Sequence, residues 1–418
     1  HRRGRRGGLG NDRRVYPDRR AGDSGPQSHP LRHLRDPTDD APDERAMSLL
    51  VDPGVVVVRD QREGKANFLG SPGVLDEFVR RARTSGRACR VAFSLDDRAI
   101  NGHAIYLQEG IRREGQHYVA DLWYYPNGVE SDASPLVINT EPREVGFYHV
   151  PTHMANPYGD LVYDLPTKPF LSIEHWVHVL HANVDFGIFA IGARFERDAE
   201  RDVGLNLRLL WRGMVERKQV LTTSRLIKIG KNCSIDPTAT IQGPAFIGNN
   251  VSIGAGAVVG NCYIGDNVTI DQGCQLMLSV VGNGSFLPFR AALYRSVLME
   301  NCVLAQNSCL QMTVVGRGSF IGAGNTFTDF NLVDRPVRSY FNGTLQDTGM
   351  TALGGAVGHN VRIGSGMIIF PARMIDSDVI LFATPERHVI RKNVLWEDSD
   401  HLGLENGENL HPRLYPRD

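Results

Sequence analysis

The chain has 418 residues, which is long enough for two or three domains that each bury a core. Its 46 Lys and Arg nearly balance its 47 Asp and Glu, so the overall charge gives no reason to expect nucleic acid or a membrane as a partner. No apolar run reaches the roughly 18 to 20 residues that span a bilayer, and no secretion signal opens the sequence, so we expect a cytoplasmic protein.

Residues 1–46 differ in composition from the rest of the chain. They combine Arg, Asp, Pro and Gly with almost no aliphatic side chains, so they cannot bury a core and are predicted to be a disordered arm. A nucleic-acid-binding arm is the weaker alternative, because acidic residues alternate with the arginines and no aromatic platform accompanies them. Met47 is the first methionine and precedes sequence typical of ordered structure, so we expect the natural protein to start near it.

Residues 47–170 show the mixed pattern of a small α/β domain. In "SPGVLDEFVRRARTSG", Val74, Phe78 and Ala82 fall on one face of a helix that ends at Gly86. Short runs rich in β-branched and aromatic residues predict strands around it. These strands are expected at residues 54–60, 88–95, 117–125, 135–140 and 144–151.

Residues 171–225 are predicted to be a helical linker, because apolar side chains recur at helical spacing in "LSIEHWVHVLHANV". His175, His178 and His181 lie three residues apart on this helix. The spacing permits a metal site, since residues three apart share a face. No carboxylate is aligned with them, so ordinary histidines at an interface are the favoured interpretation.

A period of six residues takes over at residue 226 and continues to residue 394. Neither an α-helix nor an ordinary strand has this period. A coil of three short strands does, if each aliphatic side chain faces inward and stacks on its counterpart one coil later, while Gly or Asp takes the corner. Three hexads per coil give about seven coils. The predicted inward positions are Ile229, Ile235, Ile241, Ile247, Ile253, Val259, Ile264, Ile270, Leu276, Val297, Val303, Cys309, Val315, Ile321, Phe327, Val333, Val357, Ile363, Ile369, Ile375 and Leu381.

This pattern resembles the hexapeptide-repeat left-handed β-helix family. The resemblance implies a mainly β fold: a C-terminal left-handed parallel β-helix over 226–394, a small N-terminal α/β domain with a helical linker before it, and a tail over 395–418. In that family the prisms usually form homotrimers, and most members transfer acyl groups from acyl-CoA or acyl carrier protein. For this chain it implies a phosphorylated or nucleotide-linked sugar as acceptor, acyl-CoA as co-substrate and no tightly bound cofactor.

Two stretches break the period. Residues 282–296 slip the register, and residues 334–356 leave it altogether. Long excursions from a solenoid are frequent sites of binding or catalysis, and the second one leads directly into His359. The resemblance implies a general base at this position, which suits an imidazole because its pKa lies near working pH. A corner residue with a structural role is the alternative, and it stays open here.

Further candidates near His359 are acidic side chains that orient the ring, amides that contact a sugar, and arginines that bind phosphate. They are, in that order, Asp329, Asp334 and Asp347; Asn325 and Asn342; and Arg335 and Arg338. Basic residues near the last coils are candidates for the phosphates of CoA, with a solvated face as an equal alternative. These are Arg362, Arg373, Arg387, Arg391 and Lys392.

A metal site is not expected. The six cysteines have no CxxC spacing and are predicted to be reduced thiols used as small apolar residues. A zinc carbonic anhydrase of the same fold would need three coil histidines, and the coils hold only His359 and His388.

The junction "IEHWVHVLHANV" also resembles the linker of sugar-1-phosphate nucleotidyltransferases that carry a hexapeptide prism. The glycine-rich nucleotide signature of those enzymes has no match in residues 47–70, so pyrophosphorylase activity is not expected. Arg59, Lys65 and Asp96 are the residues to test first for a sugar-nucleotide site. A nucleotidyltransferase-like protein with a degenerate catalytic domain and a non-enzymatic trimeric scaffold stay open as alternatives.

Overall fold

The computed structural model describes residues 56–59, 67–101, 107–126, 132–148, 161–192, 195, 201–217, 219–331 and 336–416. The predicted arm of residues 1–46 lies outside this set, as do Lys65, Val333, Asp334 and Arg335 and the side chain of Arg59. In the described part no helix is both long and apolar enough to cross a bilayer.

The predicted α/β pattern of the front region is confirmed. Helix α2 (Pro72–Ser85) begins where the Ser71 hydroxyl accepts a hydrogen bond from the Val74 amide, and it ends at Gly86, whose φ of 62° favours glycine. The strands form a four-stranded sheet in the order β4-β5-β3-β6, a three-stranded sheet in the order β1-β2-β9, and a β7-β8 pair. Their bounds are β1 Val56–Arg59, β2 Asn67–Gly70, β3 Cys89–Ser94, β4 Ile111–Glu114, β5 His117–Tyr124, β6 Ser134–Val137, β7 Pro142–Tyr148, β8 Leu161–Pro166 and β9 Phe170–Ser172, with a short helix α3 at Arg98–Asn101.

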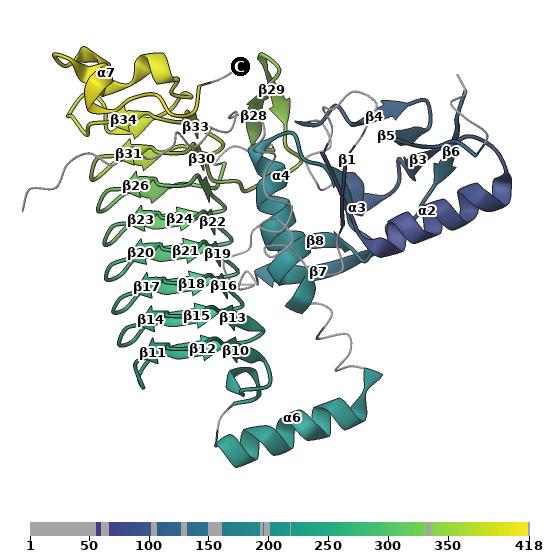
Figure 1. Ribbon diagram of the computed structural model, residues 1–418, viewed down its shortest axis with the longest axis horizontal. Helices are drawn as coiled ribbons and strands as arrows, with labels where there is room; N and C mark the ends of the chain where they lie inside the picture. Colours follow the sequence, from purple (N-terminus) through teal and green to yellow (C-terminus); the bar gives the residue numbers. More distant parts are fainter. Residues whose placement is uncertain are drawn as a thin grey trace, which may run out of the picture. The chain divides into compact units, whose positions relative to one another are not determined.

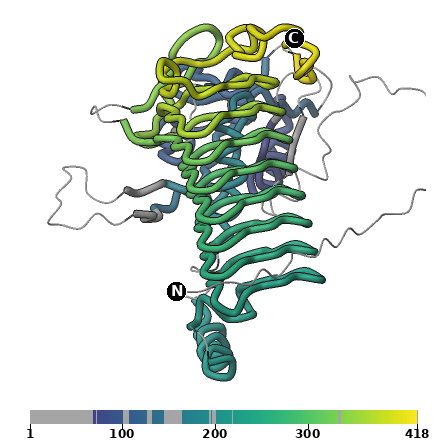
Figure 2. The backbone as a smooth tube through the Cα atoms, turned by 90° about the vertical axis from the view of Figure 1, so that its left-hand side faces the viewer, coloured from purple at the N-terminus to yellow at the C-terminus, as the bar shows by residue number. Residues whose placement is uncertain are grey.

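The C-terminal half is a parallel β-solenoid with three sheets of eight strands each. Figure 1 shows these strands stacked coil upon coil, and Figure 2 follows the same rungs from the side. The first sheet contains β10 Ile227–Ile229, β13 Ala245–Ile247, β16 Tyr263–Ile264, β19 Val280–Val281, β22 Val297–Leu298, β25 Val314–Val315, β30 Ala356–Val357 and β33 Met374–Ile375. The second contains β11 Ser234–Ile235, β14 Ser252–Ile253, β17 Thr269–Ile270, β20 Phe286–Leu287, β23 Val303–Leu304, β26 Phe320–Ile321, β31 Arg362–Ile363 and β34 Ile380–Leu381. The third contains β12 Thr240–Gln242, β15 Val258–Gly260, β18 Gln275–Met277, β21 Ala292–Tyr294, β24 Cys309–Gln311, β27 Thr326–Phe327, β32 Ile368–Ile369 and β35 Val389–Ile390.

The coil count is eight rather than about seven, and Val394, bridged to Ile375, starts a ninth. The prediction was too low because residues 282–296 stay in the solenoid, where they form β20 and β21. Only the later excursion leaves it, as a hairpin of β28 (Arg338–Phe341) and β29 (Thr344–Asp347).

The predicted inward positions are correct for most of the column and wrong for three residues. Leu298, Leu304 and Leu310 face the interior and are fully buried there, instead of Val297, Val303 and Cys309. The register moves because equivalent residues are 18 apart in the first coils but 17 apart in the middle ones. One corner of each middle coil is thus a residue shorter. A fourth difference is Ile229, which is 50% exposed because the first coil has no layer beneath it.

The short corner is held by non-glycine residues in the left-handed conformation. Leu278, Arg295 and Met312 have φ values of 49°, 46° and 48°. Helix α4 (Trp176–Leu180) continues as the π-helix η4 (His181–Phe189) and packs against this edge, where Leu180 and Val184 share a buried cluster with Leu278 and Met312. The predicted helix is therefore packed on the solenoid. Farther along the chain lie α6 (Val203–Glu216) and the 3₁₀ turn η5 (Val220–Thr222).

A buried ion pair joins the π-helix to the solenoid. Asp185 and Arg295 are each about 1% exposed, and the Asp185 carboxylate accepts a hydrogen bond from the Arg295 guanidinium. The same carboxylate is paired with the His181 ring. Charges buried this deeply are tolerated only when they are paired, so this contact fixes the register of the helix on the column.

The three linker histidines have partners within the protein. The His175 ring accepts from the Val177 amide, and the His178 Nδ1 accepts from the amides of Glu174 and His175 at 3.1 and 3.0 Å. These contacts cap the first turn of α4. The described residues include no cluster of three or more His, Cys, Asp or Glu side chains that could hold a metal ion.

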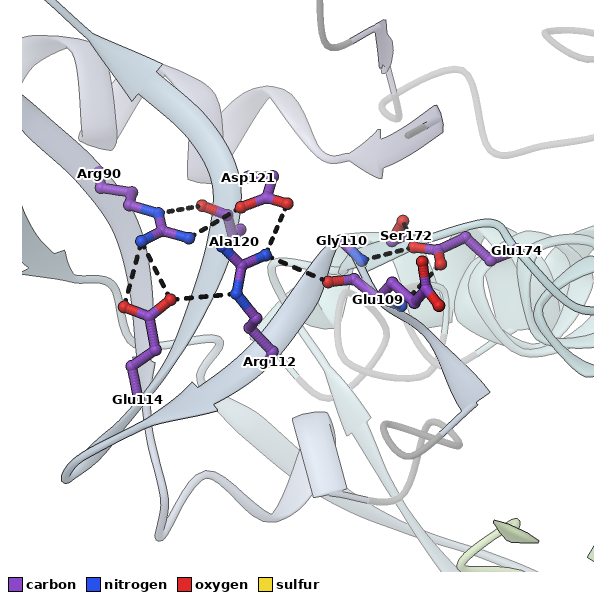
Figure 3. Close-up of polar contacts among 9 residues, drawn as sticks. All are labelled: Arg90, Glu109, Gly110, Arg112, Glu114, Ala120, Asp121, Ser172 and Glu174. Carbon is purple, nitrogen blue, oxygen red and sulfur yellow. Dashed lines mark hydrogen bonds and ion pairs between the residues drawn. The ribbon is translucent and has the colours of Figure 1, made fainter. Parts of the chain in front are cut away.

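Polar contacts also tie the start of α4 to the front sheet (Figure 3). The Glu174 carboxylate accepts hydrogen bonds from the backbone amides of Glu109 and Gly110 at 2.6 and 2.7 Å. Beside this contact, the guanidinium groups of Arg90 and Arg112 both bind Asp121 at 2.7 Å and reach Glu114 at 3.1 Å. The network thus joins the neighbouring strands β3, β4 and β5 by charges that pair with one another across the sheet.

The segment predicted as a tail folds back on the last coils. It forms η6 (Trp396–Asp398), η7 (Asp400–Gly403) and α7 (Gly407–Leu410). The Asp378 carboxylate accepts from the amides of Leu414 and Tyr415 at 2.8 and 2.7 Å, and the His411 ring lies 2.9 Å from the Asn360 carbonyl. The C-terminal end of the column is therefore covered.

Candidate functional site

Two pockets lie along the coils near the C-terminal end of the column, and some of the predicted site residues line one or the other. The larger, here called the flank pocket, has a volume of about 670 Å³ and lies between the third sheet and the β28–β29 hairpin. It is lined by Gln311, Thr326, Thr328, Asp329, Phe330, Asn331, Pro336, Val337, Arg338, Leu345, Phe370, Pro371, Arg373 and Arg391. The smaller, here called the corner pocket, has a volume of about 350 Å³ and contains His359.

The acid group of the flank pocket is Asp329, which follows strand β27. Burial raises the pKa of its carboxyl above the ordinary range, and the backbone amides of Asp329 and Phe330 oppose this shift by hydrogen bonding. With the Gln311 amide turned so that its nitrogen faces the acid, Nε2 lies 3.0 Å from Asp329 Oδ2. Gln311 stands one coil before the acid, which the six-residue pattern alone does not reveal. A half-buried carboxylate with a raised pKa is a stronger base than an ordinary exposed one, which suits it to accept a proton.

Three arginines surround the same pocket. Arg373 donates from Nε to the Pro371 carbonyl at 3.0 Å and from Nη2 to the Arg338 carbonyl at 3.3 Å. Burial lowers the pKa of its guanidinium, which still stays charged because an arginine does not deprotonate in proteins. The Arg391 guanidinium lies over the Phe370 ring, 5.7 Å from its centroid. Cations held this way on one wall favour an anionic ligand.

His359 lies at a corner of the solenoid, as predicted, and its ring is already bonded. Nδ1 accepts a hydrogen bond from the Arg317 amide at 2.9 Å, and the His359 amide donates to Ser377 Oγ at 2.9 Å. Burial, with the nearby Arg317 charge, lowers the pKa of the ring, so it is neutral at pH 7. A neutral ring whose Nδ1 is an acceptor carries its proton on Nε2. In this arrangement Nε2 can donate but cannot accept a proton.

The contact made by His359 recurs along the column. At the same corner of several coils, one side chain accepts a hydrogen bond from the backbone amide of its counterpart in the preceding coil. The accepting side chain is named first and the donating amide second in each pair: Asn249 and Lys231 at 2.8 Å, Asp266 and Asn249 at 2.6 Å, Asn283 and Asp266 at 2.7 Å, His359 and Arg317 at 2.9 Å, and Ser377 and His359 at 2.9 Å. We call this series the corner ladder. The His359 imidazole thus accepts the same hydrogen bond that asparagine side chains accept in other coils. This supports the alternative that His359 is a corner residue with a structural role. The general-base role stays a prediction.

The carboxylates expected to orient His359 are elsewhere. Asp329 lines the flank pocket, and Asp347 accepts from the Gly349 amide at 2.7 Å at the end of the hairpin. The His359 ring instead contacts the Tyr415 ring at a tilt of 45°, with the two centroids 4.8 Å apart. Tyr415 comes from the folded-back C-terminal segment, which no repeat position could have indicated.

The remaining candidates have different environments. Asn325 is fully buried; its Nδ2 donates to the carbonyls of Gly322 and Gly364 and its Oδ1 accepts from the Met367 amide, so it braces the coil and does not reach either pocket. Asn342 sits at the hairpin tip and bonds to Glu109. Arg387 is paired with Asp400, while Arg362 and Lys392 are exposed and line neither pocket.

Sequence reasoning placed Asp329, Arg338, Arg373 and Arg391 on its candidate list but did not bring them together. It missed Phe330 and Phe370, whose rings are 49% and 39% exposed at the pocket. Large apolar residues just after strands of the third sheet, outside the inward positions of the repeat, are the signal that could have found them.

Comparison with known proteins supports the fold. A family described as bacterial transferase hexapeptide (six repeats) matches residues 227–261 and 244–276. A search of curated proteins finds no match.

Among solved structures, the chain is similar to the acetyltransferase domain of PglB from Neisseria gonorrhoeae in complex with acetyl coenzyme A, at 16% identity and a TM-score of 0.15, covering 35% of this chain and 51% of that one. It is also similar to a putative acetyltransferase from Bacillus cereus, at 16% identity and a TM-score of 0.22, covering 44% of this chain and 90% of that one. A third is PerB from Caulobacter crescentus in complex with CoA and GDP-perosamine, at 14% identity and a TM-score of 0.14, covering 38% and 56%. The chain thus spans about half the length of two of these three proteins.

The repeat match and the coils agree on the same residues. Strands β10 to β17 fall within the matched stretch, and the parallel register continues from there to β35. Residues 227–276, which begin the solenoid, thus carry the hexapeptide repeat of that family.

Proposed function

We propose that this chain is an acyltransferase that moves an acyl group from acyl-CoA to a phosphorylated or nucleotide-linked sugar. The observation that carries the proposal is the flank pocket, which combines a half-buried acid, three arginines and two exposed phenylalanine rings beside a hexapeptide solenoid. Both proposed ligands bear phosphates, which arginines bind well, and CoA and nucleotides carry a flat base that a phenylalanine ring can stack on.

In the proposed step, the Asp329 carboxylate takes the proton from the acceptor hydroxyl or amine. The acceptor atom forms a bond to the acyl carbon, the bond from that carbon to the CoA sulfur breaks, and the thiolate leaves. The proton then passes from Asp329 to the thiolate, so that CoA departs as the thiol and the Asp329 carboxylate is regenerated. Arg373, Arg391 and Arg338 hold phosphates, and Gln311 keeps the carboxyl oriented.

The test is release of free CoA thiol from acetyl-CoA in the presence of a panel of sugar phosphates and nucleotide sugars. We expect Asp329→Asn to lower kcat by about a hundredfold or more, in line with the loss of a general base, with the KM for acetyl-CoA little changed. Asp347→Asn is the matched control, because this carboxylate lies outside the pocket lining and an amide keeps the oxygen that binds Gly349. Since ionised Asp329 is the active form and burial raises its pKa, the rate should fall as pH drops through that raised value.

Other outcomes separate the alternatives. Thermal stabilisation by acetyl-CoA supports the proposal, because a ligand that binds only the native state raises its midpoint. Stabilisation by UTP or a UDP-sugar alone would favour the nucleotidyltransferase-like alternative, and indifference to all of them would favour the scaffold. Loss of activity in His359→Asn with full activity in Asp329→Asn would move the proposed base to the corner pocket.

A further inference from the structure

Helix α6 exposes an apolar face. Six of its apolar side chains are between 53% and 71% exposed, although these residue types are usually buried. They are Val203, Leu207, Leu210, Trp211, Met214 and Val215. Exposed apolar residues are normal when scattered, but here they lie together on one helix of 14 residues.

The exposed side chains form a continuous stripe. Val203, Leu207, Leu210 and Met214 follow the spacing of four, three and four residues that keeps side chains on one helix face. The helix buries a different face, through Leu209 and Gly213. The helix therefore has two apolar faces. The narrower one packs against the protein through Leu209 and Gly213, and the wider stripe is exposed to solvent.

The charge around this stripe is strongly positive. Residues 201–231 contain eight Lys or Arg but only two acidic residues, Asp202 and Glu216, which leaves a net charge of +6 in a chain whose total is −1. Both acids are already paired with helix arginines, Asp202 with Arg208 at 3.3 Å and Glu216 with Arg212 at 2.6 Å. The excess of positive charge therefore lies mainly in the segment that follows the helix, residues 217–231.

We propose that α6 lies flat in the surface of an anionic lipid bilayer, with its stripe among the acyl chains and the basic residues at the headgroups. An amphipathic helix with a tryptophan on its apolar side and a basic segment next to it has the properties that this mode of binding requires. A second copy is a poorer occupant, because two such stripes would bring two highly positive segments together. Nucleic acid would use the basic residues but would leave the apolar stripe exposed.

The proposal does not depend on acyl transfer. It departs from the expectation drawn from the overall charge, because a total of −1 averages this basic segment with acidic regions elsewhere. Attraction between these Lys and Arg side chains and an anionic surface is screened by salt, so binding should weaken as the salt concentration rises.

The test is flotation of the full chain with vesicles of phosphatidylcholine, with and without phosphatidylglycerol, together with tryptophan fluorescence. We expect binding only to the vesicles that contain phosphatidylglycerol, and a blue shift that Trp211→Phe removes. The double variant Leu207→Glu and Met214→Glu should lower vesicle affinity by about a hundredfold, because two exposed apolar contacts are lost and two negative charges are added. Leu410→Glu is the matched control, since this leucine is 64% exposed at the end of α7 and should not alter binding.

Because both substituted side chains are exposed, the double variant should fold normally, and an unchanged unfolding midpoint checks this. The proposal is overturned if the wild-type chain does not float with anionic vesicles, or if the double variant floats as well as Leu410→Glu. It is also overturned if the substitutions only dissociate an oligomer, seen by sedimentation velocity, or if the preferred ligand is a DNA duplex whose binding survives them.

Discussion

Substitution of His359 separates the ladder role from the catalytic one. His359→Ala removes the acceptor for the Arg317 amide, a hydrogen bond of 2.9 Å, and the ring contact with Tyr415. A net hydrogen bond contributes about 1 kcal/mol and a ring pair about 0.5 to 1.5 kcal/mol, so the free energy of unfolding should fall by about 1.5 to 2.5 kcal/mol. His359→Asn should recover the hydrogen-bond part, because Asn249 and Asn283 make the same contact in other coils.

The assay is urea unfolding of the wild type and both variants, followed by far-UV circular dichroism. The midpoint should shift with little change in slope, which shows that stability and not compactness has changed. The lowered pKa of His359 adds a pH signature. The native ring resists protonation while the unfolded ring takes up a proton as pH falls through 6.5, so the contribution of His359 to stability is complete above that pH and is lost below it. His359→Asn should lack this acid-sensitive part.

Two results would refute the ladder reasoning. One is an asparagine variant that is as unstable as the alanine variant, since the amide oxygen would then fail to replace Nδ1. The other is a stable, fully folded His359→Asn that has lost acyl transfer, since the ring would then be needed for chemistry.

Two further predictions concern the column and the linker helix. Leu304→Ala should lower the free energy of unfolding by about 3 kcal/mol and Val303→Ala by less than about 1 kcal/mol, because only Leu304 is fully buried inside the column. Calorimetry or urea unfolding measures both losses, and equal losses would mean that the register described for this coil is wrong. Burial lowers the pKa of His175 from 6.5 to about 4, so the free energy of unfolding should decrease as pH falls between those values. His175→Gln should make the free energy of unfolding less dependent on pH over this range. A wild-type unfolding midpoint that does not change between these pH values would contradict the prediction.

The sequence predicted the solenoid well because its period has a single physical solution, a stack of inward aliphatic side chains. It could not fix the register of the middle coils, since both neighbours in pairs such as Val297 and Leu298 are aliphatic. Val297 is apolar for a separate reason: it faces outward but is buried with the helix η4 residues Val184 and Ile188. Periodicity along one segment carries no information about a helix that packs on the outside.

The sequence predicted several residues of the candidate site, but it did not predict that they line one pocket. The acid and the arginines of the flank pocket come from successive coils, the hairpin and the end of the last coil, and only the tertiary stacking brings them together. His359 shows the converse problem. A histidine at a corner has the same sequence signature whether its ring serves the backbone or a substrate, and the contact with the Arg317 amide, 42 residues away, is visible only in the structure.

The two ends of the solenoid differ in how well their coils are covered, so we expect the solenoid to unfold from one end. Ile229 at the amino-terminal coil is half exposed, whereas Asp378 near the carboxyl-terminal end is fully covered and binds two amides of the returning chain. In a stack where each rung is stabilised only by its neighbours, the rung with one neighbour opens first. Under heat or force, unfolding should therefore begin at β10 and proceed toward the C-terminal coils, so that the coils beside both pockets unfold last.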